Sequence, residues 1–205
     1  MNVINHPIAL HQLTIMRDKK SNATLFRSCL ESLSYFLAYE TTRDLGTRPV
    51  EIETPLAKME AFKTKEKVVL VPILRAGLGM VDSFRKMIPP ARIGHIGIYR
   101  NEETAKPVEY YSKLPTTTKG SVVIVLDPML ATGSSVIKAI DIIKTYQPKK
   151  IKFACVVAAP EGIEALEKAH PDVECYTVSI DKKLNKDKYI VPGLGDAGDR
   201  IFGTK

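Results

Sequence analysis

The sequence predicts an α/β protein with a doubly wound, mainly parallel sheet. Continuous apolar, β-branched runs at Val68–Leu74, Val122–Leu126 and 151–158 are typical of strands that are buried on both faces. Helix-like segments alternate with these runs, which is the pattern of βαβ crossovers in one open sheet. The length of 205 residues fits one domain.

Residues 1–66 are predicted to form an N-terminal helical arm. Its main element is a helix over residues 22–39, in which seven apolar side chains fall on one face at helical spacing: Leu25, Phe26, Cys29, Leu30, Leu33, Phe36 and Leu37. Such a stripe usually packs on the protein's own core. It also suggests association into a homodimer or a larger homo-oligomer.

Residues 67–180 are predicted to form the sheet core. Three helices lie between its strands, and each stops ahead of a proline: Leu78–Met87 before Pro89, 134–146 before Pro148, and 161–169 before Pro171. Weaker strand signals cover 93–99 and 173–180.

Two segments do not follow this alternation of strands and helices. Residues 101–120 are polar and stand where a crossover helix is expected, so we predict a mobile flap. Residues 181–205 form a tail that is rich in turn-forming residues, with Gly193, Gly195 and Gly198 close together.

Composition restricts the partners and the compartment. The chain has 30 basic and 23 acidic residues, a net charge of +7, which favours nucleic acid, nucleotides or phosphorylated metabolites as partners. Its longest apolar runs have seven residues, against about 20 for a membrane span, and no secretory signal precedes them, so a cytoplasmic location without membrane contact is expected. The three cysteines have no CxxC spacing and are expected to be buried reduced thiols.

The strongest functional signal is the loop that follows the strand Val122–Leu126. It begins with an acid and leads through small and hydroxylated residues into a helix: Asp127, Pro128, Met129, Leu130, Ala131, Thr132, Gly133, Ser134 and Ser135. Free backbone N–H groups, hydroxyls and the positive end of the helix dipole together bind phosphate, and Asp127 stands where it can accept hydrogen bonds from ribose hydroxyls. A well-capped strand-turn-helix without a ligand is the structural alternative.

Arg75 follows another buried strand, beside Gly77 and Gly79. A guanidinium next to glycine-rich backbone suits a second phosphate group, although a single arginine here is often only a surface residue. Two anion sites at one sheet edge suggest a substrate that is phosphorylated at both ends.

Other functional motifs are excluded. The loop lacks the Walker lysine, and neither HExxH nor GxSxG occurs, so ATPase, zinc and hydrolase functions are not indicated. The tail matches GxGxxG at Gly193, Gly195 and Gly198, but only seven residues follow, too few for a dinucleotide-binding unit. Such a turn instead presents backbone groups that can read the edge of a base, so residues 181–205 are predicted to form a small C-terminal base-binding hood.

Five ordered motifs make the chain resemble the uracil phosphoribosyltransferase family over nearly its full length. They are 13–18 (LTIMRD), 74–80 (LRAGLGM), 100–104 (RNEET), 127–133 (DPMLATG) and 189–200 (YIVPGLGDAGDR). The resemblance implies the type I phosphoribosyltransferase fold. It also implies transfer of phosphoribosyl from phosphoribosyl pyrophosphate (PRPP) to N1 of uracil, giving UMP and pyrophosphate with the help of Mg²⁺.

The resemblance also implies roles for particular residues. Residues 132–135 hold the 5′-phosphate, Asp127 meets the ribose, and Arg75 and Arg100 contact the pyrophosphate. Asp196 faces the donor and its magnesium. The uracil-binding residues are Ile190, Gly195, Asp196 and Ala197. Some relatives are activated by GTP, which makes GTP a candidate effector.

One residue departs from the commoner family pattern, which has glycine at position 134. If this position needs a positive φ, Ser134 carries strain; otherwise its hydroxyl adds a phosphate donor, which is the interpretation we favour. Two other functions remain open: transfer to another base, and an RNA-binding regulator on the same fold. RNA is disfavoured because the basic residues of the tail alternate with acids and lack an aromatic set.

Overall fold

A central sheet organises the molecule. The computed structural model describes residues 1–100 and 107–204. The strand order is β1 (Asn2–Val3), β12 (Glu174–Thr177), β10 (Lys150–Ala154), β8 (Val122–Leu126), β4 (Val68–Leu74), β6 (His95–Arg100) and β7 (Pro107–Lys113), with β5 (Arg92–Ile93) also pairing with β4. Neighbouring strands are parallel except for the antiparallel pair β6 and β7.

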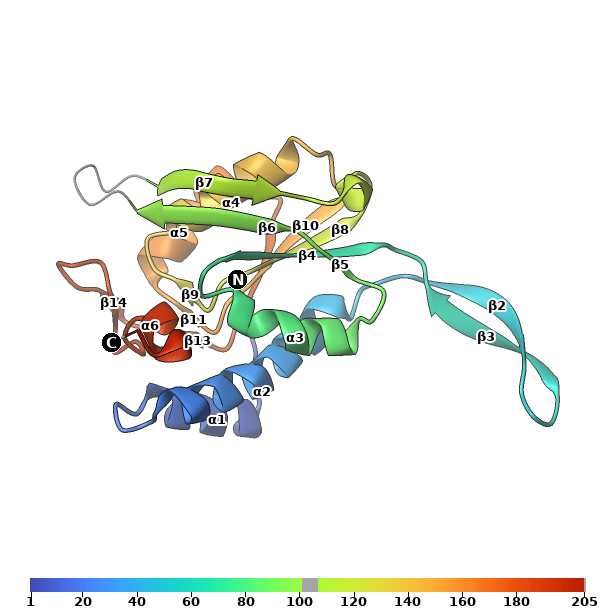
Figure 1. Cartoon of the computed structure of the whole chain (residues 1–205), viewed down its shortest axis with the longest axis horizontal. Coiled ribbons are helices and arrows are strands. Elements are labelled where there is room, and N and C mark those ends of the chain that lie inside the picture. The colour runs from blue at the N-terminus through green and yellow to red at the C-terminus, as the bar shows by residue number, and fades with distance from the viewer. Residues whose placement is uncertain (101–106, 205) are drawn as a thin grey trace.

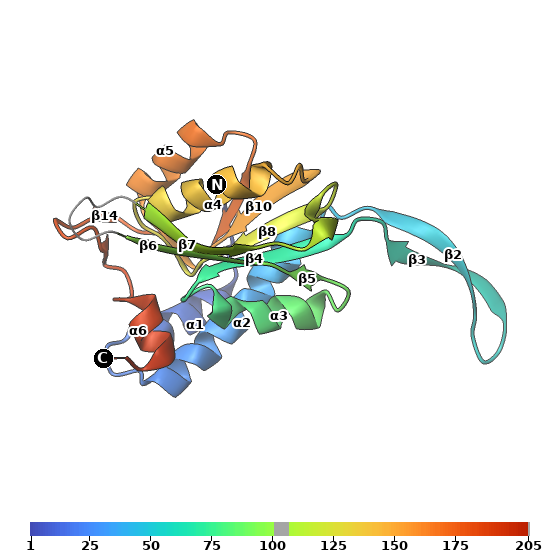
Figure 2. The same cartoon turned by 45° about the horizontal axis from the view of Figure 1, so that its top comes forward.

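Helices cover both faces of this sheet (Figure 2). On one face lie α4 (Ser134–Lys144) and α5 (Pro160–Ala169), and on the other α1 (Pro7–Arg17), α2 (Ala23–Thr42) and α3 (Leu78–Met87). Alternate side chains of β4 enter the two cores: Val69 and Val71 pack in the cluster that contains α4, and Val68 and Leu70 in the cluster that contains α2. The predicted doubly wound α/β fold is confirmed.

The apolar stripe of α2 packs on the core. Phe26, Cys29, Leu30, Leu33 and Leu37 are buried, whereas Leu25 at the edge of the stripe is exposed. The stripe is therefore used for folding. Cys155 and Cys175 are also buried free thiols, as expected.

Three strands of the sheet break and then resume as a smaller parallel sheet. This second sheet contains β9 (Met129–Leu130), β11 (Val157–Ala158) and β13 (Ser179–Ile180), which follow β8, β10 and β12 in the chain. The single strand predicted over 151–158 is therefore two strands, and so is 173–180. The break carries the loop after β8 to the carboxyl edge of the sheet, where ligands bind in open α/β folds.

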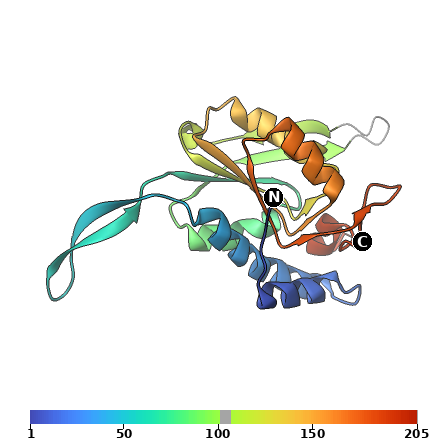
Figure 3. The same ribbon diagram turned by 180° about the vertical axis from the view of Figure 1, so that it is seen from behind.

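The N-terminal arm is not wholly helical, which corrects the prediction for residues 1–66. β2 (Thr47–Glu53) and β3 (Lys58–Thr64) form an antiparallel hairpin that projects far from the body (Figure 1, and from behind in Figure 3). Val50 and Ile52 alternate there with Glu51 and Glu53, which is the period of a strand. Without a core beneath it, this short alternation is a weak signal.

Residues 101–120 also differ from the expected flap. Residues 107–113 are β7, paired with β6 at the sheet edge, and Thr116–Thr118 form a short 3-10 helix, η1. Gly97 permits this pairing, because a Cβ there would lie 2.5 Å from the Tyr110 ring. Residues 101–106 lie outside the described part of the chain.

The C-terminal tail returns to the N-terminal helices. It contains β14 (Lys183–Leu184), β15 (Ile190–Val191) and α6 (Ala197–Phe202), and Figure 3 shows α6 beside the start of the chain's helical region. Arg200 of α6 donates hydrogen bonds to the carbonyls of Met16 and Asp18 at 2.8 and 2.7 Å. In residues 1–100 and 107–204 we find no helix with the length and apolarity that a bilayer crossing requires.

Candidate functional site

The loop between β8 and α4 gathers several hydrogen-bond donors at the edge of the sheet. Gly133 precedes α4 with φ of 80° and has no side chain to cap the helix. The Ser134 N–H makes a long hydrogen bond of 3.4 Å to the Thr132 hydroxyl oxygen, and the next N–H groups of the first turn point to the same place. The Thr132 and Ser134 hydroxyl oxygens lie 3.1 Å apart at the same place. The loop therefore combines the donors that the sequence predicted for a phosphate site.

Ser134 carries no backbone strain. It is the first residue of α4, and the left-handed conformation belongs to Gly133 before it. Position 134 does not need a positive φ, so the alternative of strain is wrong, and the role of its hydroxyl as a phosphate donor stays a prediction.

Asp127 begins this loop as a half-buried carboxyl group. Burial raises its pKa to about 7, and the hydrogen bond that Oδ1 accepts from the Met129 N–H, at 3.2 Å, opposes this rise only in part. The group is thus poised between a neutral and an ionised form near neutral pH.

Two glycines bring the surrounding backbones close together. A Cβ on Gly77 would lie 2.3 Å from the carbonyl oxygen of Leu126, and one on Gly162 would lie 2.3 Å from that of Ala131. The loop after β4 therefore packs directly on the end of β8, and the start of α5 packs on the loop between β8 and α4, here called the phosphate loop after its predicted ligand. From the sequence, no functional role is predicted for Gly162, because it lies inside a predicted helix.

Arg75 stands at the mouth of the same sheet edge. Its side chain is 58% exposed, with Nη2 3.8 Å from Asp199 Oδ1 and the guanidinium 5.8 Å from the centre of the Phe202 ring. The cation thus lies between the loop after β4 and helix α6. Arg100 ends β6, and its side chain lies outside the described part of the structure.

The tail supplies the opposite wall of the site. Gly193 and Gly195 have φ of 61° and 79°, and Asp196 caps α6 by accepting a hydrogen bond from the Asp199 N–H at 2.9 Å. Ala197 begins α6 and is buried. The glycine motif is therefore a turn into a short helix, and no dinucleotide-binding unit surrounds it.

One cavity joins the phosphate loop to the tail. It has a volume of about 190 Å³ and is lined by Met129, Ala131, Asp187, Lys188, Tyr189, Ile190 and Asp196. All of them lie in the loop or the tail that the sequence predicted to bind donor and base, and four were named individually: Met129, Ala131, Ile190 and Asp196. The contribution of residues 187–189 was missed, because their polar sequence is also typical of an exposed turn.

Comparisons with known proteins agree with this geometry. The model of the family described as uracil phosphoribosyltransferase matches residues 3–204. The chain belongs to this family. It is 58% identical to the uracil phosphoribosyltransferase of Malacoplasma penetrans over 99% of this chain and 98% of the relative, and 57% identical to that of Ureaplasma urealyticum over 99% of both. The resemblance stated from the motifs is confirmed, as is the transferase class.

Solved structures confirm the fold of the family member. The AQ2163 protein from Aquifex aeolicus superposes with a TM-score of 0.95 at 37% identity, over 99% of this chain and 98% of the other. A hypoxanthine-guanine phosphoribosyltransferase from Bacillus anthracis shares the fold at a TM-score of 0.51 and 15% identity, over 77% and 80% of the two chains. The type I phosphoribosyltransferase fold is therefore shared with enzymes that are named for purine bases.

The described residues of this uracil phosphoribosyltransferase family member offer limited metal ligation. They contain no group of three or more His, Cys, Asp or Glu side chains that could hold a metal ion. Asp196 uses Oδ1 in the α6 cap, so Oδ2 is the oxygen that could ligate a metal ion. A single carboxylate fits Mg²⁺ only where substrate oxygens and water complete the coordination, which is the usual arrangement for this ion beside phosphates.

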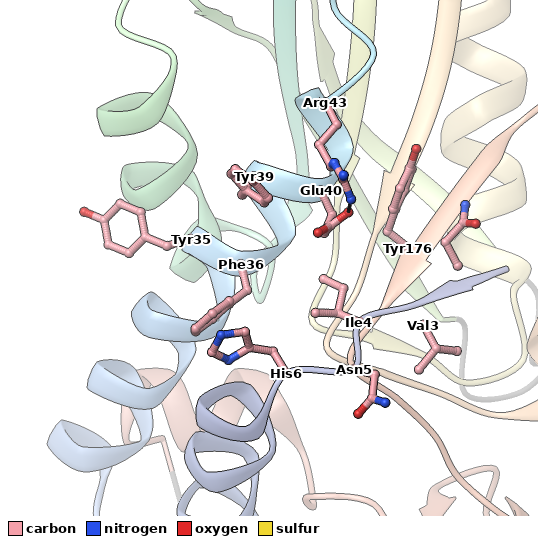
Figure 4. Close-up of a pocket in the computed structure, with 11 residues that line it drawn as sticks. Val3, Ile4, Asn5, His6, Tyr35, Phe36, Tyr39, Glu40, Arg43 and Tyr176 are labelled. Carbon is pink, nitrogen blue, oxygen red and sulfur yellow. Dashed lines mark hydrogen bonds and ion pairs between the residues drawn. The ribbon is translucent and has the colours of Figure 1, made fainter.

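A second pocket lies away from this site, between α2 and the first residues of the chain (Figure 4). Its volume is about 560 Å³, and its lining includes Tyr35, Phe36, Tyr39, Arg43 and His6. The His6 and Phe36 rings are 4.6 Å apart, and Arg43 pairs with Glu40 at 3.1 Å. Glu40 also lines the pocket and neutralises Arg43, so the aromatic faces suit a planar ring and the pocket has no unpaired cation among its described residues.

Proposed function

We propose that this family member transfers the phosphoribosyl group of PRPP to N1 of uracil, forming UMP and diphosphate in pyrimidine salvage. The observation that carries the proposal is the cavity in which Met129 and Ala131 of the phosphate loop face Ile190 and Asp196 of the tail. A donor held by one wall and a base held by the other would meet there. Membership of the family supports the identity of both substrates.

The donor would be held along the sheet edge. The 5′-phosphate would occupy the cradle of residues 132–135, and the ribose would lie against residues 127–131, with its hydroxyls on Asp127. The guanidinium groups of Arg75 and Arg100 would neutralise the pyrophosphate, because planar guanidinium forks match phosphate oxygens.

Uracil would be recognised by the main chain of the tail. Ile190, Gly195 and Ala197 would present backbone groups to the base, and Asp196 would lie between base and donor. Cytosine would place an amino group opposite an N–H that suits the O4 of uracil. Such a buried mismatch costs about 1 to 3 kcal/mol, which favours uracil.

The chemistry would rest on placement and charge. As the anomeric C–O bond breaks, positive charge develops on the ribose and negative charge on the leaving pyrophosphate. Arg75 and Arg100 would stabilise that leaving charge, and the tail would hold N1 of uracil opposite it. Bound Mg²⁺ would supply further positive charge at the pyrophosphate, with Asp196 Oδ2 as the protein ligand.

The proposal extends to assembly, regulation and location. The projecting hairpin of β2 and β3 exposes Ile52, Met59 and Phe62, which supports a homodimer or larger homo-oligomer. The aromatic lining of the second pocket could take the guanine ring of GTP as an effector that binds outside the substrate cavity. Three buried free cysteines are consistent with the reducing conditions of the cytoplasm.

The test is UMP formation from radiolabelled uracil, PRPP and Mg²⁺, with and without GTP. We expect the wild type to form UMP, and Arg75→Ala to lower kcat/KM for PRPP by about 10² to 10³, the usual effect of removing one group that stabilises transition-state charge. Arg85→Ala is the matched control, because Arg85 is also an exposed arginine but pairs with Asp82 on α3. No UMP from the wild type would refute the activity, and equal rates for Arg75→Ala and Arg85→Ala would remove Arg75 from the mechanism.

A further inference from the structure

The turn that links β15 to α6 has little regular structure to fix its shape. β14 and β15 pair over only two residues each, and the turn then passes through Gly193 and Gly195 in left-handed conformations. The base-binding residues of the proposed function stand at both ends of this turn. Its geometry therefore depends on bonds from other parts of the chain.

Arg200 of α6 donates to the Leu194 carbonyl of the turn at 3.0 Å, and an ion pair from two more distant elements supplies the bonds at Gly193. Arg17 at the end of α1 meets Asp181, 164 residues later, in a two-pronged contact: Nη1 to Oδ2 at 2.7 Å and Nη2 to Oδ1 at 2.5 Å. Arg17 Nη2 also donates to the Ser179 hydroxyl oxygen at 3.1 Å, and that hydroxyl donates to Asp181 Oδ1 at 3.1 Å. Such a fork defines the relative orientation of both side chains.

This pair holds both polar backbone groups of Gly193. The carbonyl of Gly193 accepts a hydrogen bond from Arg17 Nη1 at 2.6 Å, and its N–H donates to Asp181 Oδ2 at 2.7 Å. A Cβ at this position would lie 2.1 Å from the Ile190 carbonyl oxygen, so the glycine is pressed against the start of the turn. One ion pair thereby fixes the middle of the turn against Ile190.

We propose that Arg17 and Asp181 are positioning residues for uracil: they hold the turn at Gly193 in the conformation that accepts the base. The inference rests on the proposed function of the tail. Neither residue is among those that line the cavity between phosphate loop and tail, so their effect on the base passes through the backbone.

Stability alone is a weak explanation for this pair. The Asp181 side chain is only 3% exposed, and its burial opposes ionisation, although Arg17 and the Gly193 N–H hold its pKa below the ordinary value. Buried ion pairs often contribute little net stability because desolvation offsets their attraction. Their directional bonds nevertheless select one backbone geometry, which is what a base-binding turn requires.

The test separates the Michaelis constants of the two substrates. We compare Asp181→Asn and Arg17→Lys with the wild type. An amide has one acceptor oxygen in place of two, and a lysine ammonium cannot reproduce the planar fork. We expect KM for uracil to rise at least about tenfold in both variants, while KM for PRPP stays within about twofold.

Lys152→Met is the matched control. Lys152 is also a buried cation, with Nζ 2.6 Å from the Thr41 carbonyl oxygen and an ion pair to Asp44, but it ties α2 to β10. This variant should lower Tm and leave both Michaelis constants unchanged.

The outcomes distinguish this inference from the proposed function. If the wild type forms UMP and both tail variants keep the wild-type KM for uracil, the inference is refuted and the function stands. A parallel rise in both Michaelis constants would also refute it, since that result indicates general loosening of the fold. If Asp181→Asn does not fold, Arg17→Lys decides alone, because its charge is retained.

Discussion

At the residue scale, Asp127 links stability to pH. Its pKa is about 7 in the folded protein against an ordinary value of 3.8, so between these values the folded state binds the proton and the unfolded state does not. The contribution of Asp127 to stability therefore falls as pH rises from about 4 to about 7 and then stays constant. We predict that the Tm of Asp127→Asn, relative to wild type, is higher at pH 8 than at pH 5, measured by differential scanning calorimetry.

The same substitution should weaken the binding of PRPP, and this loss should be larger at high pH than at low pH. An ionised carboxylate accepts hydrogen bonds from ribose hydroxyls more strongly than an amide does, because a hydrogen bond to a charged group contributes about 1.5 to 3 kcal/mol and one to a neutral group about 0.5 to 1.5 kcal/mol. We therefore expect KM for PRPP to rise at least about tenfold in Asp127→Asn at pH 8, and by less at pH 6, where wild-type Asp127 is mostly neutral. A Tm difference that does not change between pH 5 and pH 8 would contradict the raised pKa.

The location of a single residue in the candidate site could be predicted from the sequence where that residue type is unusual at its position in a strand or helix. Arg75 directly after a buried strand and Asp127 at a strand's end both indicated the sheet edge that the structure shows. Arg17 and Asp181 gave no such signal, because an arginine at a helix end and an aspartate in a polar tail are both ordinary. Their pairing depends on a contact across 164 residues, which no local pattern contains.

At the element scale, burial decided which parts of the fold could be predicted. β4, β8 and α3 have the predicted bounds, because strong apolar runs and proline stops define them. β7 was missed since an edge strand with exposed Tyr110 and Tyr111 has little hydrophobic contrast. The projecting hairpin has no core of its own, so its short alternation was not recognised.

The hairpin of β2 and β3 should be an assembly element. Val50 and Ile52 pair with Ala61 and Met59 and so form one apolar face, which a two-stranded ribbon cannot keep stable in water without cover. We predict that Met59→Glu shifts the wild-type oligomer towards monomer and raises its dissociation constant at least about tenfold. Light scattering with size-exclusion chromatography measures the change.

Leu10→Glu is the control for this prediction. Leu10 on α1 is 44% exposed and Met59 is 49% exposed, so the same charge replaces a similarly exposed apolar side chain away from the hairpin. The oligomer should survive this change. A monomeric wild type, or equal dissociation by both variants, would contradict the role assigned to the hairpin.

At the scale of the whole molecule, the candidate site is assembled from the entire chain. The loops after β4 and β8 come from the middle of the chain, and the turn that we propose binds the base comes from the last 25 residues. The ion pair that holds this turn reaches back to α1. The sequence predicted the two loops because each carries its chemistry locally. It did not predict how the tail is held, since that depends on the packing of α1 and α2 beneath α6.

The net charge of the molecule should distinguish its two substrates. The protein carries +7, whereas PRPP is a polyanion and uracil is neutral. Attraction between the protein's field and the donor is screened by salt, with a Debye length of about 10 Å at 0.1 M. We therefore predict that KM for PRPP rises several-fold between about 50 and 300 mM NaCl, while KM for uracil in the same assays stays within about twofold.

Uracil is the internal control, because a loss of folded enzyme or a general salt effect would change both constants. Equal salt dependence for the two substrates would show that the charge of the molecule does not guide the donor, and that only the groups in direct contact with PRPP determine its binding.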